Sequence, residues 1–431
     1  MDRRSGQERE RSSPESRAAF RVGYSARCCL IPISYRFNTP LGKPCQNYWG
    51  RIRSVTEARS PRHHRARKAL TLVKSVLSER QTLHPSDIER RDLPEPAARA
   101  VRHLAAEIAV TVGPCAETAT TLSHPVLLRH IEAKYGRLPD AVHEAMRPPA
   151  TDAGVTVIRP LPIGDEELGA TPHDWREAAA WAGDRTRRSA SFELDIAMLL
   201  LARCAGEPFG WEGQQGGRLV NNIVPTPGHE HEQSGASSTT LLSPHTEDAF
   251  HPDRANLLML GCLRNPERVG TTVSSVRCTE LDAAQRETLS RARLPILPDV
   301  SYGTGFDDAP APAVATLGSD EGQLTLRFDP AYTPLDTADH EFRSAYRHLA
   351  AELERVCITA ALTPGELLLV DNDVVVHGRV PFTPRYDGTD RWLKRVNIRL
   401  PQRRRAAAEA GEDGYGQRVV APFRTSRGTN T

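Results

Sequence analysis

The chain has 431 residues, 39% of them hydrophobic and 26% charged, and a formal net charge of +2 at pH 7. Its apolar runs fall short of the roughly 20 residues that a membrane-spanning helix needs, and the charged start MDRRSGQERERSSPESR lacks the apolar region of a secretory signal. The eight Cys are scattered without a CxxC pair, and in a chain of this length they exclude a disulfide-stapled mini-fold and indicate reduced thiols. We therefore expect a cytoplasmic protein without a membrane partner.

The charge is divided unevenly along the chain. Residues 1–80 carry 18 Lys and Arg against 6 Asp and Glu, a net charge of +12, whereas the remaining 351 residues carry 38 against 48, a net charge of −10. A basic arm is one signature of nucleic-acid binding, but no binding module is recognisable in it, so we expect no nucleic-acid partner. We predict that 1–80 is a disordered or mis-annotated N-terminal extension, that 81–402 form the functional domain, and that 403–431 are a loose C-terminal tail.

Helices are predicted where apolar residues recur at helical spacing, at 95–110, 125–135, 174–182, 192–204, 282–292 and 338–357. The segment FELDIAMLLLARC (192–204) is apolar nearly all round, which indicates a helix buried against a sheet. Beyond residue 207 the pattern favours strands at 218–224, 239–242, 256–263, 271–277, 366–370 and 391–400, with a hairpin at 313–328 that turns at 319–322. The expected fold class is mainly β with flanking helices, around one β-sandwich core of roughly 200 residues.

Two short stretches far apart in the sequence carry the residue types of an iron site. In a strand, residues i and i+2 share a face, so His245 and Glu247 can point together while Thr246 points away. His377 follows the apolar run LLLVDNDVVV, which suits a core strand, and the next residue, Gly378, permits close backbone approach. Two imidazoles and one carboxylate on one face of Fe(II) leave the opposite face open for a chelating co-substrate and O2.

A further cation follows the second stretch. Arg391 begins the last predicted strand, and an Arg in that place can form a bidentate pair with a carboxylate. An HxE pair alone has little specificity, but together with the late His and the Arg it indicates a site for iron and an anionic co-substrate.

These residues resemble the clavaminate-synthase-like branch of the Fe(II)/2-oxoglutarate-dependent oxygenases, of the taurine-dioxygenase type. Within that branch the resemblance is to the arginine and asparagine β-hydroxylases of peptide-antibiotic pathways, and it covers residues 85–400. It is densest in GQQGGRLVNNIVP (213–225), HEQSGAS (231–237), HTEDAFHPDRANLL (245–258), LRNPE (263–267) and DNDVVVHGRVPFTPRYDGTDRWLKR (371–395). Most of the wider superfamily has HxD, and Glu at the third position is typical of this branch.

The resemblance implies a double-stranded β-helix (jelly-roll) core over 81–402 and assigns roles to individual residues. His245, Glu247 and His377 would be the iron ligands, and Arg391 would bind 2-oxoglutarate with help from Thr272 or, less strongly, Thr271. Residues expected to contact the substrate are Arg395 at the α-carboxylate, Gln214 or Gln215 at the polar end, and Asp329 at the side-chain terminus. The arginine enzymes tend to carry a second acid two residues later, where this chain has Ala331, so a guanidinium clamp is half absent and a shorter or differently charged side chain fits equally well.

The implied reaction uses Fe(II), 2-oxoglutarate and O2 to hydroxylate an unactivated C–H, at Cβ, of an amino acid or a derivative, in secondary metabolism. Succinate and CO2 are the co-products. The substrate is either free or tethered to a carrier protein. The carboxylate of Glu247 argues against halogenation, because related halogenases lack it to make room for chloride, while desaturation and ring closure stay open.

Several alternatives stay open for these residues. Arg391 can instead pair with Asp387 or Asp390, Asp329 is equally suited to a turn, and Gln214 is equally suited to a polar loop. The segment HEHE (229–232) lies in a Gly/Pro/Ser-rich loop that suits a lid over the substrate better than a second metal site. A jelly-roll binding or regulatory module without turnover is the alternative to an enzyme.

Overall fold

The computed structural model describes residues 88–112, 122–159, 161–184, 189–303, 306, 312–320, 323–403 and 405–423. All of them belong to one unit, Pro44–Thr431. The predicted N-terminal extension 1–80 and the two residues at the turn of the predicted hairpin lie outside the described residues.

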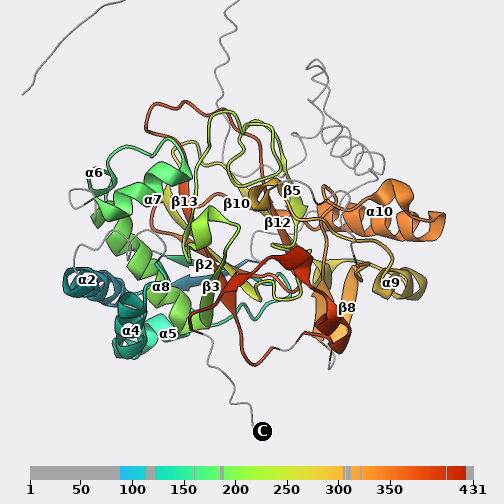
Figure 1. Cartoon of the computed structure of the whole chain (residues 1–431), viewed down its shortest axis with the longest axis horizontal. Helices are drawn as coiled ribbons and strands as arrows, with labels where there is room; N and C mark the ends of the chain where they lie inside the picture. Colours follow the sequence, from blue (N-terminus) through green and yellow to red (C-terminus); the bar gives the residue numbers. More distant parts are fainter. Residues whose placement is uncertain are drawn as a thin grey trace, which may run out of the picture. The chain divides into compact units, whose positions relative to one another are not determined.

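Two sheets carry the fold (Figure 1). The larger has the strand order β1-β2-β11-β6-β13-β3-β14, with β4 also pairing with β13, and its pairs are antiparallel except β1 with β2. Its strands are β1 (Glu89–Asp92), β2 (Val155–Arg159), β3 (Glu207–Trp211), β4 (Asn221–Ile223), β6 (Leu257–Arg264), β11 (Leu367–Asp371), β13 (Trp392–Arg399) and β14 (Val419–Val420). The smaller sheet has the antiparallel order β10-β7-β12-β5, from β5 (Leu242–His245), β7 (Thr271–Ser275), β10 (Ile358–Ala360) and β12 (Val375–Arg379).

Helices cover the sheets from two sides. In Figure 1, α2 (Glu95–Val112), α4 (Pro125–Lys134), α5 (Asp140–Ala145) and α8 (Leu194–Ala205) lie on one side, and α9 (Ala283–Ser290) and α10 (His340–Arg355) lie on the other. Near the first group are α6 (Asp165–Leu168) and α7 (Trp175–Gly183). Short 3-10 or π segments are η4 (Tyr135–Arg137), η5 (Ser189–Glu193), η6 (Gln215–Gly217), η7 (Val276–Cys278), η8 (Val300–Tyr302), η9 (Leu335–Thr337), η10 (Ala407–Gly411) and η11 (Gly414–Gly416).

The core strands are buried on both faces, and alternate residues enter different layers. On β6, Leu257 and Met259 join the cluster formed with α2 and α8, whereas Leu258 and Leu260 join the cluster that contains residues of the smaller sheet and α10. This alternation is the period of two expected of a strand. Successive side chains of the neighbouring strand β13 likewise point in turn to the helix layer and to the smaller sheet.

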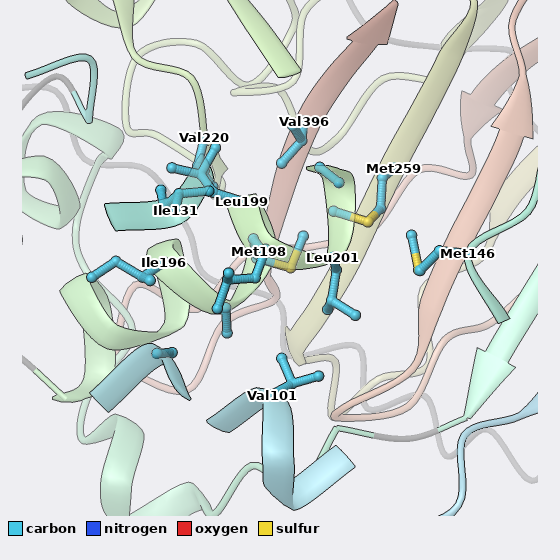
Figure 2. Packing of buried hydrophobic residues seen from close by; sticks show 14 of the residues in the cluster. Val101, Ile131, Met146, Ile196, Met198, Leu199, Leu201, Val220, Met259 and Val396 are labelled. Atoms are coloured by element: carbon cyan, nitrogen blue, oxygen red, sulfur yellow. The ribbon is translucent and has the colours of Figure 1, made fainter. Parts of the chain in front are cut away.

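The predicted buried helix at 192–204 is confirmed as α8. Every residue from Leu194 to Ala202 on this helix is buried, and Figure 2 shows side chains of α8 meeting Val101 of α2 and Met259 of β6. Gly261 on β6 makes the close packing possible, because a Cβ there would lie 2.8 Å from the sulfur of Met198. The other predicted helices are also present, with ends that differ by a few residues.

Three strand predictions differ from the structure. The strand predicted at 239–242 lies later in the chain, as β5 (Leu242–His245). The run LLLVDNDVVV is divided between two sheets, because a turn after Asp371 ends β11 and the chain re-enters the other sheet as β12. The strand predicted at 218–224 shortens to β4, since Gln215, Gly216 and Gly217 have positive φ and hold η6 before it. The predicted hairpin is present as β8 (Leu317–Asp320) paired with β9 (Gln323–Leu326).

The C-terminal segment differs from the predicted loose tail. Arg403 forms a 2.7 Å ion pair with the buried carboxylate of Asp371, Glu409 pairs with the buried Arg254 at 2.6 Å, and β14 extends the larger sheet. Buried charges need partners, and residues 403–412 supply them. The boundary of the functional domain near 402 stays a prediction, and the described chain continues on the fold to Phe423.

Within the described residues, no helix combines the length and apolarity that crossing a membrane would require.

Candidate active site

Two histidines and one glutamate from two segments far apart in the sequence meet at the edge of the smaller sheet. His377 on β12 is the cross-strand partner of His245 on β5, and their ring centroids are 4.4 Å apart. The Oε2 atom of Glu247 lies 3.7 Å from Nε2 of His245 and 3.3 Å from Nε2 of His377. One donor atom from each residue fits within 4.8 Å of the others, so the group can hold a single metal ion.

Backbone contacts aim the three side chains. Nδ1 of His245 lies 2.8 Å from the Ser243 carbonyl, and a proton on Nδ1 that donates to this carbonyl leaves Nε2 free as a ligand. The prediction for Gly378 is confirmed, because a Cβ there would lie 2.5 Å from the carbonyl oxygen of Leu242. Only a glycine lets β12 approach β5 this closely, and this approach brings the two imidazoles together.

Contrary to the prediction from the sequence, Glu247 does not lie on the same strand as His245. β5 ends at His245, so Glu247 follows the strand rather than sharing its face by alternation. The buried side chain of Asn372 instead fixes it, since Oδ1 accepts from the Glu247 N–H at 2.9 Å and Nδ2 donates to the Glu247 carbonyl at 3.1 Å. Asn372 lies in the turn between β11 and β12, so one turn orients the carboxylate and starts the strand that carries His377.

The charges around the cluster suit a cation. Burial opposes the ionisation of Glu247, but Arg395 and the two imidazoles outweigh it and hold the pKa of Glu247 well below its usual range. Burial and the charge of His245 lower the pKa of His377, so this imidazole is neutral near pH 7. An ionised carboxylate and a neutral imidazole are the forms that bind a metal. Burial opposes protonation of His245, but Glu247, Asp329 and the Ser243 carbonyl outweigh it and raise the pKa of His245 to about 9. A metal that binds there therefore displaces a proton from this imidazole.

A cavity of about 250 Å³ opens beside the cluster. The three metal-site residues line it together with Arg391, Arg395 and Gln214. The sequence therefore identified residues that the structure brings to one cavity, although they come from different sheets and loops.

Arg391 is a buried cation without a carboxylate partner among the described residues. Its Nη2 donates to Thr271 Oγ1 at 3.4 Å, and its Nε has no hydrogen-bond partner. Burial lowers the pKa of Arg391 to about 10, which leaves it charged at neutral pH. Because a buried guanidinium without a partner is costly, its place on the cavity fits an anionic ligand.

The threonine beside Arg391 is Thr271 and not Thr272, the residue favoured from the sequence. Thr271 lines the cavity, whereas the side chain of Thr272 turns toward Gly378 on the neighbouring strand, where a Cβ would lie 2.9 Å from its Oγ1. Neighbouring residues of a strand point to opposite faces of the sheet, so only one of these two threonines can face the cavity. The alternative in which Arg391 pairs with Asp390 does not fit either, because that carboxylate accepts the backbone N–H groups of Arg385 and Tyr386.

Arg395 lies on the same side of β13 as Arg391 and reaches the metal cluster. It forms an ion pair with Glu247 and donates to Gln214 and to Asn221, the last at 3.0 Å. Lys394, between them, points to the opposite layer and pairs with Asp195 on α8 at 2.5 Å. Gln214 was predicted here, while Asn221 was not singled out by the sequence.

Two further carboxylates line the cavity. Asp329 was predicted there, and its Oδ1 also accepts the Ala331 N–H at 3.0 Å, so the substrate-facing and turn roles proposed for it are compatible. Asp299 was not predicted, and it lines the same cavity from η8, where it caps Ser301 at 2.6 Å. Burial, opposed by the charge of His245 and reinforced by Asp299, raises the pKa of Asp329 to about 7. No spacing rule links positions 299 and 329, so the sequence had no signal for this pair.

The HEHE loop does not form a second metal group with three ligands in the part of the chain that the structure describes. His229 forms a 2.9 Å pair with Glu232, and the His229 side chain is 42% exposed. Residues of this loop line the cavity, which agrees with its predicted place over the substrate.

Comparison with known proteins identifies the family. The family model described as "Taurine catabolism dioxygenase TauD, TfdA family" matches residues 150–397. The chain belongs to this family. The oxygenase is 39% identical to enduracididine beta-hydroxylase of Streptomyces hygroscopicus over 269 residues, which cover 57% of this chain and 76% of that relative. It is 35% identical to clavaminate synthase 2 of Streptomyces clavuligerus over 272 residues, which cover 61% of this chain and 80% of the relative.

Solved structures agree with the sequence comparison. The non-heme iron oxygenase OrfP in complex with Fe and alpha-ketoglutaric acid superposes with a TM-score of 0.60 at 36% identity, covering 72% of this chain and 94% of OrfP. OrfP in complex with Fe, succinate and (3S)-hydroxy-L-Arg gives a TM-score of 0.62 at 33% identity, covering 72% of this chain and 94% of OrfP. The predicted resemblance, and with it the dependence of this oxygenase on iron and 2-oxoglutarate, is confirmed.

Proposed function

We propose that this oxygenase hydroxylates Cβ of an amino acid whose side chain ends in a cationic group, in secondary metabolism. The observation that carries this proposal is one cavity lined by the His245–Glu247–His377 cluster, by two arginines (Arg391 and Arg395) and by two carboxylates (Asp299 and Asp329). The sheet pair that frames the cavity corresponds in this proposal to the two sheets of a double-stranded β-helix.

His245, Glu247 and His377 would hold Fe(II) through two Nε2 atoms and one carboxylate oxygen. The donor set fits, because two imidazoles and one carboxylate in a facial arrangement are typical of non-heme Fe(II) oxygenases. Bound iron supplies oxidation of a substrate C–H with O2 and 2-oxoglutarate, which leaves as succinate and CO2. The remaining contributions come from residues that orient the two organic substrates and exclude water.

Arg391 would hold the distal carboxylate of 2-oxoglutarate, with Thr271 as the accompanying hydroxyl. The support is the buried guanidinium of Arg391, which has an unpartnered Nε and no carboxylate of the described chain beside it. A bidentate pair with a carboxylate would satisfy both its charge and its hydrogen bonds.

Arg395 and Gln214 would orient the backbone end of the amino acid. Arg395 lies between Glu247 and the amides of Gln214 and Asn221, so a substrate α-carboxylate bound there is held next to the metal ligands. The Cβ atom of an α-amino acid is two bonds from the carboxylate carbon, which keeps its C–H bonds near the metal ligands and favours reaction at Cβ.

Asp299 and Asp329 would bind the end of the side chain. The sequence left this point open, because Ala331 stands where the arginine enzymes tend to have a second acid. A second carboxylate, Asp299, lines the same cavity from a different segment, at the start of η8, and would take the place of the missing acid. Two carboxylates favour a guanidinium or ammonium group over a neutral amide. The similarity to enduracididine beta-hydroxylase and to OrfP with bound (3S)-hydroxy-L-Arg supports the same class of substrate, in free form.

The test is turnover by protein loaded with Fe(II) without air and then supplied with 2-oxoglutarate, O2 and a panel of L-arginine, L-ornithine, L-lysine, L-asparagine and L-valine. We expect succinate formation that depends on a cationic amino acid and a product heavier by one oxygen atom, with the hydroxyl on Cβ by NMR. A product lighter by two hydrogen atoms would redirect the proposal to desaturation or ring closure. Turnover with L-asparagine alone would contradict the role of the two carboxylates, and bound iron without turnover of any free amino acid would favour a carrier-tethered substrate or a binding module.

A further inference from the structure

Asp248 follows the metal-site residue Glu247, and its buried carboxylate accepts hydrogen bonds from three segments of the chain. Its Oδ2 accepts from Trp211 Nε1 on β3 at 2.7 Å and from Asn397 Nδ2 on β13 at 3.3 Å, and its Oδ1 accepts from the Tyr302 hydroxyl at 2.5 Å. Asp248 has a positive φ of 53°, which is uncommon for a residue other than glycine. Asp248 is not among the residues that line the cavity, unlike its neighbour Glu247, so its side chain serves the protein rather than a ligand.

Tyr302 connects Asp248 to the segment that recognises the substrate side chain. It is the last residue of η8 (Val300–Tyr302), and Asp299 and Ser301, just before it, line the cavity. The Tyr302 ring packs edge-on against Phe250 and Trp211, with centroid distances of 5.0 and 6.1 Å. This packing fixes the ring so that the Tyr302 hydroxyl lies beside the carboxylate of Asp248.

A second chain of contacts links the same two places from the cavity side. Gln214 Nε2 donates to Ser301 Oγ at 3.1 Å, and Gln214 Oε1 accepts from Arg395, which pairs with Glu247. Together with the peptide bonds between Glu247 and Asp248 and between Ser301 and Tyr302, these contacts form a closed ring. Two separate connections therefore link Glu247 to the η8 segment. One runs through Asp248 and Tyr302, and the other runs through Arg395, Gln214 and Ser301.

We propose that Asp248 and Tyr302 are positioning residues that hold the Asp299–Ser301 segment in place relative to the metal ligand Glu247. This inference rests on the proposed function, in which Asp299 binds the side-chain terminus of the amino acid. Loss of the hydrogen bond between Tyr302 and Asp248 leaves the metal site and the 2-oxoglutarate site intact, but lets Asp299 move away from the substrate. The amino acid then binds less tightly, and its target C–H bond is held less well, so 2-oxoglutarate is consumed without hydroxylation.

The test compares Tyr302→Phe with Tyr415→Phe. The first substitution keeps the ring against Phe250 and removes the hydroxyl from Asp248, whereas the second removes a buried hydroxyl with no hydrogen-bond partner from another ring that packs on Phe250. Both variants are assayed as Fe(II)-loaded full chains with the panel amino acid that the wild type turns over best. Three quantities are measured: the calorimetric Kd for that amino acid without O2, the KM for 2-oxoglutarate, and the ratio of succinate to hydroxylated product.

For Tyr302→Phe we expect a Kd for the amino acid about 10-fold higher, a KM for 2-oxoglutarate within about twofold of the wild type, and more than one succinate per hydroxylated product. Tyr415→Phe should match the wild type in all three. Asp248→Asn serves as a second variant that keeps the side-chain shape and should shift the same quantities as Tyr302→Phe.

The inference is overturned if Tyr302→Phe and Asp248→Asn keep the wild-type Kd and coupling ratio. It is also overturned if the Kd for the amino acid and the KM for 2-oxoglutarate rise together and the melting temperature falls, since that pattern indicates a general structural role. A wild-type chain that forms no amino-acid-dependent succinate would overturn the proposed function, whereas wild-type turnover with unchanged variants would overturn only the positioning role.

Discussion

His245 and His377 are directly opposite each other on the antiparallel strands β5 and β12, although they lie far apart in the sequence. Their imidazoles share the Oε2 atom of Glu247 as a neighbour, at 3.7 and 3.3 Å. We expect His377→Ala to abolish both iron binding and succinate formation, because two protein ligands do not hold Fe(II) at this site. Iron content after desalting measures the effect. His229→Ala, in an exposed His–Glu pair on the same cavity, is the control and should keep its iron.

Asn372 holds Glu247 through the main chain on both sides, by donating to its carbonyl and accepting from its N–H. We expect Asn372→Ala to weaken iron binding by about 10- to 100-fold, the usual effect of removing a residue that orients a metal ligand. A titration with Fe(II) under anaerobic conditions measures this. Recovery of affinity in Asn372→Asp would count against the role, because a carboxylate cannot donate to the Glu247 carbonyl.

Arg391 is the residue that we expect to discriminate between 2-oxoglutarate and a 2-oxo acid that lacks the distal carboxylate. Arg391→Met should raise the KM for 2-oxoglutarate by about 100-fold, since hydrogen bonds to a charged group contribute about 1.5–3 kcal/mol. The Kd for the amino acid should change little. Arg385→Met, which removes a half-exposed ion pair with Glu267, is the matched control. An unchanged KM for 2-oxoglutarate in Arg391→Met would contradict the assignment.

Asp329 predicts a pH dependence for the binding of a cationic amino acid. Burial raises the pKa of Asp329 to about 7 in the ligand-free protein, so the carboxylate is ionised above that pH and protonated below it. Only the ionised form attracts a cation, so the KM for the amino acid should rise as the pH falls from 8 to 6. In Asp329→Asn the KM should be higher at pH 8 and change less with pH. A wild-type KM that is constant over this range would contradict the proposed contact.

A stability prediction concerns the layer behind the site. Asp195 on α8 is fully buried and pairs with two buried cations, Lys394 at 2.5 Å and Arg218 at 2.7 Å. Asp195→Asn would remove the buried carboxylate that these two cations share, and we expect it to lower the free energy of unfolding by about 3–5 kcal/mol. Chemical denaturation measures this. Glu95→Gln, which breaks an exposed pair with Arg99, should cost less than about 1 kcal/mol.

The sequence predicted elements whose apolar pattern is strong and left out those whose pattern is weak. The buried helix α8 and the strand β6 follow from their apolar runs. In contrast, β1 has the charged sequence ERRD and, among the described residues, pairs with β2 alone at one end of the larger sheet. The metal residues were found because HxE and a distant His have a recognisable spacing. Asn372, Asp299 and Asp248 have no such spacing, because turns and tertiary contacts alone bring them to the site. Thr272 was chosen over Thr271 since the sequence does not state which residue of β7 faces the cavity.

The central claim is that this chain inserts oxygen from O2 into an amino acid while it converts 2-oxoglutarate to succinate. The most direct measurement is turnover under 18O2 with the best amino acid of the panel, followed by mass spectrometry of both products. We predict one labelled oxygen atom in the amino acid product, one in succinate, and equal amounts of the two products. Labelled succinate with an unmodified amino acid, or a product that carries no label, would contradict the claim.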